Sequence, residues 1–268
     1  MKKILFLGGL LVVLAGVVVF SSSITNAIHS WGGYHWTRQS NPFTLTVVDS
    51  VTSEWDSYLD TANSDWSVSS VLDLAKEEGS INSTDRRRCN PVAGKIRACN
   101  STYGNNGWVG LAQIWISSGN HITQGVAKMN DTYFKKSYYN TAPWRRLVMC
   151  QEIAHDFGLG HQDEFFNNAN LGSCMDYTDD PDGGLGGAVN NDPSNEHPNF
   201  HDYDQLETIY NAHFDSAVVG ENGPKGNHGN AADEWGKAIR QDGDGRTSLY
   251  ERDLGKGDKV VTFIIWAE

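Results

Sequence analysis

Alternation of apolar and polar residues predicts four strands in the first half of the chain. Residues 43–51 (FTLTVVDSV) alternate and are rich in β-branched side chains, which is typical of a strand. Residues 70–77 predict a shorter strand with a more ambiguous pattern. Residues 110–117 and 121–130 predict two further strands, because the turn-forming residues SSGN lie between them.

Apolar residues at helical spacing predict three helices. The first begins near Ser53 and keeps an apolar face as far as Ala62. The third follows a long loop of Asn, Asp, Gly and Pro at residues 167–199, and Asp202 with Gln205 resembles its capping box. The buried side of this third helix consists of Tyr203, Leu206, Ile209 and Tyr210.

The second helix is the best defined of the three. Asn140 or Thr141 can cap it, Pro143 suits its first turn and Gly158 ends it. The stripe that would hold this helix to a core consists of Cys150, Ile153, Ala154 and Phe157.

Residues 1–27 predict export from the cytoplasm. Two lysines precede an unbroken apolar run at residues 4–20, and Thr25 and Ala27 are small residues that a signal peptidase would accept. The run is close to the roughly 17 residues of the shortest membrane-spanning helices, so an uncleaved anchor is the alternative to a cleaved signal peptide. Both alternatives place the rest of the chain outside the cytoplasm, as a secreted or membrane-anchored protein.

The other end of the chain predicts an extension with its own pattern. After a Gly- and Asn-rich start, residues 235–267 alternate on both sides of the turn DGDG, which predicts a β-hairpin. We therefore divide the chain into the export segment at residues 1–27, a folded domain at residues 28–214 and a C-terminal extension at residues 215–268.

The net charge of the chain disfavours anionic binding partners. Without Lys2 and Lys3 the chain carries 19 basic and 33 acidic residues, a net charge of −14. Such a protein repels nucleic acids and anionic lipids. We expect no nucleic-acid partner, and contact with a membrane only through an uncleaved N-terminal segment.

Four cysteines in an exported chain predict disulfide bonds. Three pairings are possible. Cys89 and Cys99 lie close together in the sequence and suggest a local loop, which leaves Cys150 with Cys174. The second bridge would tie the second helix to the loop that follows it.

The residues QEIAHDFGLGH predict a metal centre at the end of the second helix. Gln151 and His155 are four residues apart and lie on one helical face. Gly158 has no Cβ, so the backbone can turn sharply and direct His161 to the same point. A catalytic zinc needs three protein ligands and an open position for water. Glu152 is placed to take a proton from that water and pass it to a leaving amine.

This pattern resembles the metzincin zinc metalloproteases, of matrixin or adamalysin type. These enzymes combine an extended zinc-binding helix with a methionine-containing turn below the metal, and Met175, in CMDY, lies 14 residues past His161. The resemblance covers roughly residues 43–213. It implies an α+β fold with a twisted mixed sheet, an active-site helix, a Met-turn and a C-terminal helix.

The same resemblance implies how a substrate would bind. A peptide or protein substrate would lie extended along the edge strand of the sheet and add a strand to it. The residues of that edge strand would be Gly110, Leu111, Ala112 and Gln113.

One residue departs from the family pattern, because Gln151 stands where the first zinc-binding histidine is expected. An amide oxygen reaches about as far as an imidazole nitrogen, but zinc prefers His, Cys and carboxylate ligands. Substitute ligands would be Asp163, a reduced Cys150 or His201. We expect a secreted zinc endopeptidase with the metal on His155, His161 and Gln151. The alternative is an inactive pseudo-protease that serves as an extracellular binding module.

Calcium is a second candidate cation. Residues 240–251 resemble a calcium loop, but Arg240 occupies the first position, where an acid is required, so a hairpin turn is favoured. The acidic loop at residues 176–184 also offers carboxylates, and a solvated turn is the favoured interpretation there. The loop positions that do match are Asp242, Asp244, Gly245 and Glu251.

Overall fold

A computed structural model describes residues 29–117, 119–211, 213–216 and 229–268. The predicted export segment at residues 1–27 lies outside the described residues. No helix in the described ranges is long and apolar enough to span a membrane.

Within these ranges the fold is α+β, with a mixed sheet of nine strands, as the sequence predicts in outline. The strands are β1 (His35–Trp36), β2 (Phe43–Ser50), β3 (Leu72–Glu78), β4 (Ile96–Ser101), β5 (Trp108–Ser117), β6 (His121–Asn130), β7 (Lys237–Gln241), β8 (Thr247–Gly255) and β9 (Asp258–Trp266). Their order is β3-β2-β4-β6-β5-β9-β8-β7, with β1 paired to β6. Strands β1 to β4 and β6 are parallel to their neighbours in this set, whereas β5 runs antiparallel to both β6 and β9.

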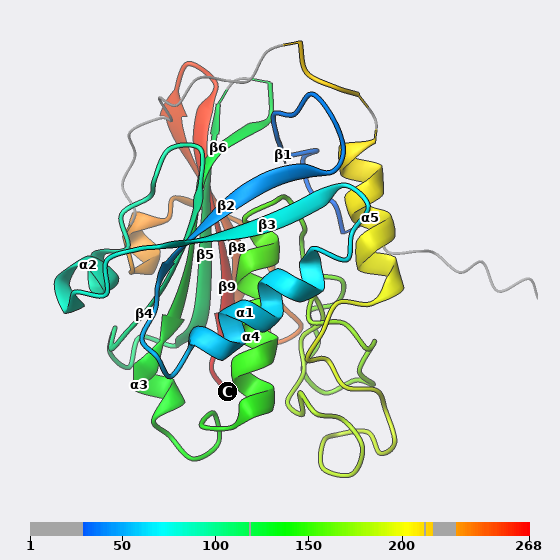
Figure 1. Cartoon of the computed structure of the whole chain (residues 1–268). Helices are drawn as coiled ribbons and strands as arrows, with labels where there is room; N and C mark the ends of the chain where they lie inside the picture. Colours follow the sequence, from blue (N-terminus) through cyan, green and yellow to red (C-terminus); the bar gives the residue numbers. More distant parts are fainter. Residues whose placement is uncertain (1–28, 118, 212, 217–228) are drawn as a thin grey trace, which may run out of the picture.

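The helices are α1 (Asp56–Trp66), α2 (Ser83–Arg88), α3 (Asp131–Phe134), α4 (Ala142–His155), α5 (Phe200–Tyr210) and the short 3-10 helix η1 (Ala232–Glu234). Helices α1 and α4 lie together against one face of the sheet (Figure 1). The main hydrophobic core fills the space between them and the strands, and includes the buried rings of Trp55, Trp66 and Phe157.

Helix α4 forms where its caps and apolar stripe predict it. Thr141 occupies the N-cap position and its hydroxyl accepts a hydrogen bond from the backbone N–H of Trp144, while Pro143 lies in the first turn. All four residues of the predicted stripe are buried. The helix ends at His155, and Gly158 follows with φ of +101°, where an added Cβ would collide with the carbonyl oxygen of Tyr34. Only glycine allows this turn and this close approach.

Two predicted caps are wrong. Helix α1 has Trp55 at its N-cap and no side-chain cap, so Ser53 does not cap it. The capping box of α5 is formed by Asn199 and Asp202, and not by Asp202 and Gln205. The box predicted for α5 is out of register because Asn199, in extended conformation, can bond the first free N–H groups of the helix.

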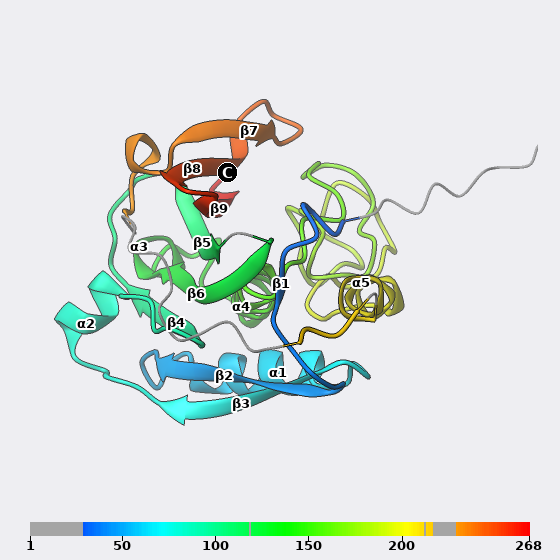
Figure 2. The same ribbon diagram turned by 90° about the horizontal axis from the view of Figure 1, so that it is seen from above.

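The C-terminal extension belongs to the same sheet as the rest of the protein. The predicted hairpin is present as β7 and β8 around the DGDG turn, and β9 follows β8. Strand β9 pairs with β5 along nearly its whole length, with Ala112 opposite Phe263 and Gln113 opposite Thr262. Viewed from above, β9 lies between β5 and β8 (Figure 2). Strand β5 is therefore not an edge strand in this structure, contrary to the prediction.

The composition of β9 explains its place in the sheet. Phe263 and Ile265 join the main core on one face, and Ile264 packs with Trp108 and Trp235 on the other. A strand that is apolar on both faces is stable only where both faces are covered. The apolar side chains of β9 that are at most 1% exposed are Val260, Val261, Phe263, Ile264 and Ile265.

Two disulfide bonds join Cys89 to Cys99 and Cys150 to Cys174, which confirms the favoured pairing. The first closes a local loop before β4. Such bonds persist in oxidising compartments, which agrees with an extracellular protein, although export itself stays a prediction.

Candidate metal centre

The motif at the end of α4 lies inside the protein. Gln151, Glu152 and His155 are fully buried, and His161 is 5% exposed. After Gly158 the chain reverses and passes the segment at Ser30, which bridges to Leu159. This turn brings His161 back beside the last turn of α4, as the glycine predicts.

The two motif histidines converge on one point. Their Nε2 atoms lie 2.9 Å apart. The Nδ1 atom of His155 lies 2.7 Å from the carbonyl oxygen of Leu159, and the Nδ1 atom of His161 lies 2.5 Å from Oε1 of Glu164. Because a carbonyl or carboxylate oxygen only accepts, each Nδ1 donates a proton and each Nε2 is left with a lone pair. Two lone pairs that face each other at this distance repel unless a cation or proton lies between them.

Burial keeps both histidines neutral. It lowers the pKa of His155 well below its ordinary value, and the neighbouring His161 lowers it further. Burial also lowers the pKa of His161. Neutral imidazoles whose second nitrogen is hydrogen-bonded to an oxygen are the usual form of histidine ligands to zinc.

Glu164 completes the support of His161 and was missed in the sequence. Burial acts to raise the pKa of Glu164, but His161 and Arg240 beside it hold the pKa below its ordinary value. The guanidinium of Arg240 lies 2.7 Å from Oε1 of Glu164. A carboxylate–histidine pair of this kind orients a metal ligand and raises its basicity. The signal was present in the sequence, because HQDE places an acid three residues after His161.

Gln151 offers a neutral oxygen as a donor atom. Its amide nitrogen donates to the carbonyl oxygen of Cys174 at 2.8 Å, which fixes the orientation of the amide group. Its Oε1 atom is buried and has no hydrogen-bond partner within the part of the chain that the structure describes. A buried acceptor left unpaired costs about 1–3 kcal/mol. A cation held with the two histidines would satisfy this oxygen.

The substitute ligands predicted from the sequence make other contacts in the structure. The carboxylate of Asp163 accepts hydrogen bonds from the N–H of Phe165 and the side chain of Asn168. Cys150 is in a disulfide bond, and the ring of His201 lies against the ring of His29. Gln151, with its buried and unpaired oxygen, therefore stays the favoured third ligand.

Glu152 is fully buried in α4, directly after Gln151 in the sequence. Neither of its carboxyl oxygens has a hydrogen-bond partner among the described residues. An added Cβ at Gly110 of β5 would collide with Oε1 of Glu152, so the glycine leaves room for this carboxyl group. Burial raises the pKa of Glu152 well above its ordinary value, and Asp156 raises it further. Burial in this environment therefore favours the protonated form of the carboxyl group over the charged form.

Strand β9 covers the centre. The ring of Phe263 stacks on His155, with ring centroids 4.1 Å apart and an interplanar angle of 6°. The hydroxyl of Tyr177 donates to the carbonyl oxygen of Ile264 and its ring lies 4.5 Å from that of His161. The place predicted for a peptide substrate is thus taken by the protein's own strand. The motif predicts neither the position of the C-terminal extension nor the contacts of Tyr177 and Phe263 with the two histidines.

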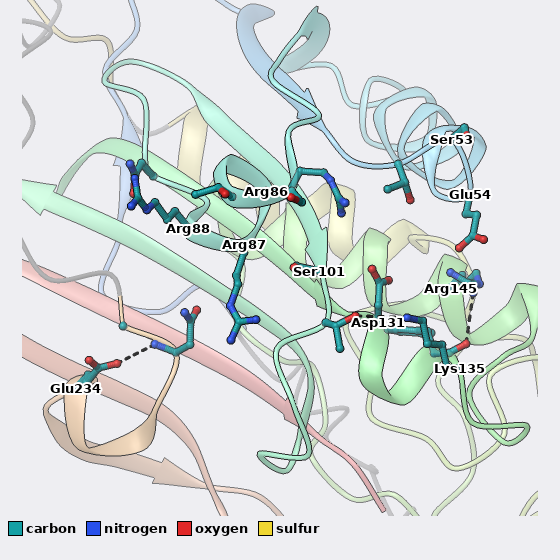
Figure 3. A pocket seen from close by; sticks show the side chains of 18 residues that line it. Ser53, Glu54, Arg86, Arg87, Arg88, Ser101, Asp131, Lys135, Arg145 and Glu234 are labelled. Carbon is teal, nitrogen blue, oxygen red and sulfur yellow. Dashed lines mark hydrogen bonds between the residues drawn. The ribbon is translucent and has the colours of Figure 1, made fainter.

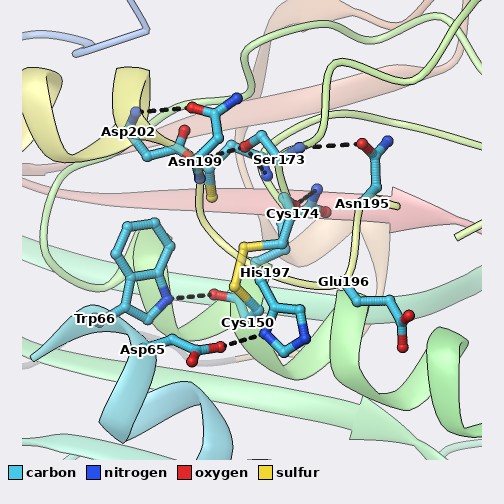
Figure 4. The surroundings of a disulfide bond; sticks show 12 residues. Asp65, Trp66, Cys150, Ser173, Cys174, Asn195, Glu196, His197, Asn199 and Asp202 are labelled. Carbon is cyan, nitrogen blue, oxygen red and sulfur yellow. Dashed lines mark hydrogen bonds and ion pairs between the residues drawn. A yellow bond between two sulfur atoms is a disulfide. The ribbon is translucent and has the colours of Figure 1, made fainter. Parts of the chain in front are cut away.

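Met175 lies in the turn directly after the second disulfide bond. Its N–H donates to the hydroxyl of Ser173, and its carbonyl oxygen accepts from the N–H of Gln162, next to His161. Figure 4 shows how the disulfide joins α4 to this turn, with the indole of Trp66 donating to the carbonyl oxygen of Cys150. Met175 is therefore hydrogen-bonded to the residue that follows the motif. Its role below a metal stays a prediction.

The residues that resemble a calcium loop form a hairpin turn, which is the favoured interpretation of their sequence. The guanidinium of Arg246 bonds the carboxylates of Asp242 and Asp244 at 3.1 Å and 3.0 Å. Asp242 also accepts the backbone N–H groups of Asp244 and Arg246. These oxygens stabilise the turn between β7 and β8, as predicted for a hairpin.

A second histidine cluster was not found from the sequence. His35, His121, His213 and Asp215 bring one ligand atom each to a group whose atoms all lie within 4.8 Å of one another. This group could hold a metal ion. The only sequence signal for it is the short His-x-Asp spacing of His213 and Asp215.

A cavity of about 1200 Å³ lies away from both histidine clusters. Figure 3 shows the basic side chains that line it from α2, from the residue after α3 and from the start of α4, together with a few carboxylates. The charged residues are Arg86, Arg87, Arg88, Lys135, Arg145, Glu54, Asp131 and Glu234. None of the motif residues is among those that line it.

In comparisons with known proteins, no family model matches the chain and no curated protein is similar to it in sequence.

Proposed function

We propose that the protein is a zinc-dependent peptide hydrolase of metzincin type, and that β9 keeps it latent as long as this strand is paired with β5. One observation carries the proposal: the Nε2 atoms of His155 and His161 face each other at 2.9 Å while their Nδ1 atoms are both committed to oxygen acceptors. The unpaired oxygens of Gln151 and Glu152 lie on the same helix. Together these groups form a donor set for a cation beside an acid–base residue.

Each residue then has a defined task. His155, His161 and Gln151 would hold the zinc, which when bound acts as a Lewis acid and lowers the pKa of a bound water. Glu152 would hold the proton of that water and deliver it to the leaving amine. Its raised pKa suits a group that must keep a proton before passing it on. Glu164 and the carbonyl oxygen of Leu159 would keep the two imidazoles in place.

Latency follows from the burial of β9. Five of its apolar side chains are at most 1% exposed, and each contributes about 1.5–3 kcal/mol by its burial. Releasing β9 as a whole therefore costs on the order of 10 kcal/mol, which leaves it open in fewer than about one molecule in a million. Turnover would require a lasting displacement of β9, so the full chain should hydrolyse peptides very slowly.

The same burial favours a second candidate, the non-catalytic binding module. If β9 never leaves β5, the centre holds a metal without access for substrate. The weaker ligand Gln151 also fits this reading, because a site that only stabilises the fold does not need the strongest zinc affinity.

The experiment combines metal analysis with a substitution that opens the centre. Phe263→Ala removes the ring on His155 and weakens the packing of β9, so that β9 should leave β5 far more often. We expect one zinc per chain to disappear in His155→Ala, and the Phe263→Ala variant to cleave an unstructured protein such as casein at a rate that falls at least a hundredfold when Glu152→Gln is added.

Zinc that depends on His155, without any hydrolysis that depends on Glu152, would support the binding module instead. A natural chain without zinc at this centre, combined with a gain of zinc in Gln151→His, would mean that the centre has lost its metal.

A further inference from the structure

Three segments that lie far apart in the sequence meet at one end of the sheet. His35 is in β1, His121 is the first residue of β6, and His213 and Asp215 follow α5. The pairing of β1 with β6 places His35 directly opposite His121. The parallel register fixes these two side chains, and the chain after α5 brings the other two.

The distances within this cluster suit a small cation. Oδ1 of Asp215 lies 3.1 Å from Nε2 of His121 and 3.4 Å from Nε2 of His213. Four ligands in a tetrahedron around zinc, each at about 2.0–2.1 Å from the metal, are roughly 3.3 Å apart. Two edges of such a tetrahedron are therefore already close to their final length.

In His35 and Asp215, the atom that would not bind a metal is held by another partner. Nδ1 of His35 lies 2.7 Å from the carbonyl oxygen of Gly33 and so donates its proton there, which leaves Nε2 with a lone pair. Oδ2 of Asp215 accepts the backbone N–H of Arg38 at 3.0 Å. These are the contacts that orient metal ligands in known zinc sites.

The clearest sign is the unpaired nitrogen of His35. This residue is 5% exposed, and its Nε2 atom is buried with no hydrogen-bond partner among the described residues. The ring of His35 lies with its centroid 4.9 Å from that of His121 and 5.0 Å from that of His213. A plain ion pair between His121 and Asp215 would leave the His35 nitrogen without a partner, whereas a shared cation would not.

We propose that His35, His121, His213 and Asp215 form a second zinc site, with four protein ligands and no open position for water. Three imidazoles and one carboxylate suit zinc better than calcium or magnesium, which prefer oxygen ligands. A closed four-ligand site is structural. It would tie the chain after α5 to β1 and β6. Because Trp36, beside His35, donates from its indole to the carbonyl oxygen of Asp156, the site would also steady the end of α4.

The test uses the full chain in a His155→Ala background, which removes the first candidate centre. After incubation with zinc and dialysis, we expect one zinc per chain in this background and none when His121→Ala is added. The matched control is His197→Ala, which removes a half-exposed histidine paired with Asp65 outside the cluster and should keep the zinc. Circular dichroism checks that each variant is folded.

A second substitution covers the case in which His121→Ala does not fold. Asp215→Asn keeps the size of the side chain and an oxygen for the N–H of Arg38, and should weaken zinc binding at least tenfold. Cobalt(II) in place of zinc should give the visible absorption of a four-coordinate site in the His155→Ala background, and that absorption should vanish with Asp215→Asn. Zinc that survives His121→Ala in a folded chain, or no zinc at all in the His155→Ala background, would overturn the proposal. Neither result depends on peptide hydrolysis.

Discussion

The two histidine clusters of this protein differ in access. The motif centre is made by 11 consecutive residues and is sealed, with His155 fully buried under Phe263 of β9. The second cluster is assembled from segments about 180 residues apart, and the side chain of His213 is 52% exposed. A short motif can therefore define a donor set while the rest of the fold closes it, and a site without a motif can stay open to solvent.

The largest difference should appear in the rate of zinc loss to a chelator. We expect two phases in the full chain: a fast one from the second cluster, and one at least a hundred times slower from the motif centre, because the slow phase waits for β9 to open. Asp215→Asn should remove the fast phase and Phe263→Ala should speed the slow one. The zinc released to an indicator dye gives both rates. A single phase that Asp215→Asn leaves unchanged would contradict the comparison.

The stability of the seal gives the next largest effect. Phe263 is 1% exposed and stacks on His155, so Phe263→Ala should lower the free energy of unfolding by about 3–5 kcal/mol. Urea unfolding followed by tryptophan fluorescence measures it, with Leu185→Ala as control, since Leu185 is 82% exposed and its loss should change stability by less than about 0.5 kcal/mol. A loss below about 1 kcal/mol for Phe263→Ala would mean that β9 does not seal the centre.

Zinc at the second cluster should stabilise the fold by mass action. In the His155→Ala background, free zinc at a hundred times the dissociation constant should add about 2.7 kcal/mol to the free energy of unfolding. Urea midpoints with zinc and with chelator measure the difference. The same titration in a chain that also carries Asp215→Asn should give a much smaller gain, and equal gains would place the zinc elsewhere.

Acid should lower the stability of the folded protein through His29, which is buried beside the motif. Burial and the nearby His201 lower the pKa of His29 to about 4, and its Nδ1 atom lies 3.2 Å from the carbonyl oxygen of Gly160 in the motif. The unfolded chain binds this proton near pH 6.5 and the folded chain only near pH 4, so the stabilisation is complete above pH 6.5 and is lost as the pH falls to 4.

Per pH unit, the effect of His29 is the smallest of these effects. Its loss should approach about 1.4 kcal/mol per pH unit within that window. His29→Gln should make the pH dependence of unfolding shallower between pH 6.5 and 4, as measured by urea unfolding at several pH values. An unchanged slope would show that His29 already carries a proton in the folded protein.

Local structure was predictable from the sequence where one segment contains all the information. The strands near residues 43–51, 110–117 and 121–130 appear within two residues of their predicted limits, and α4 begins after the predicted cap at Thr141. The cap at Ser53 was wrong because α1 begins after Trp55 without a side-chain cap. The box at Asp202 with Gln205 was wrong because Asn199 accepts the first N–H groups of α5.

The convergence of the motif was predictable for the same reason. The spacing of Gln151 and His155 and the turn at Gly158 act over a few residues, so the sequence by itself determined that His161 returns to α4. The sequence also favoured the correct disulfide pairs, because ten residues separate Cys89 from Cys99. Such features depend on backbone geometry that is the same wherever the segment lies.

Only the tertiary structure decided what surrounds these groups. The apolar residues of β9 require burial on both faces but do not specify a partner, and the exposed edge of β5 was the place that could provide it. Likewise, His35, His121 and Asp215 come together only through the β1–β6 register and the path of the chain after α5. Periodicity and capping act between neighbours along the chain, whereas strand pairing and side-chain clusters depend on contacts between distant segments, and those contacts form only when the whole core is packed.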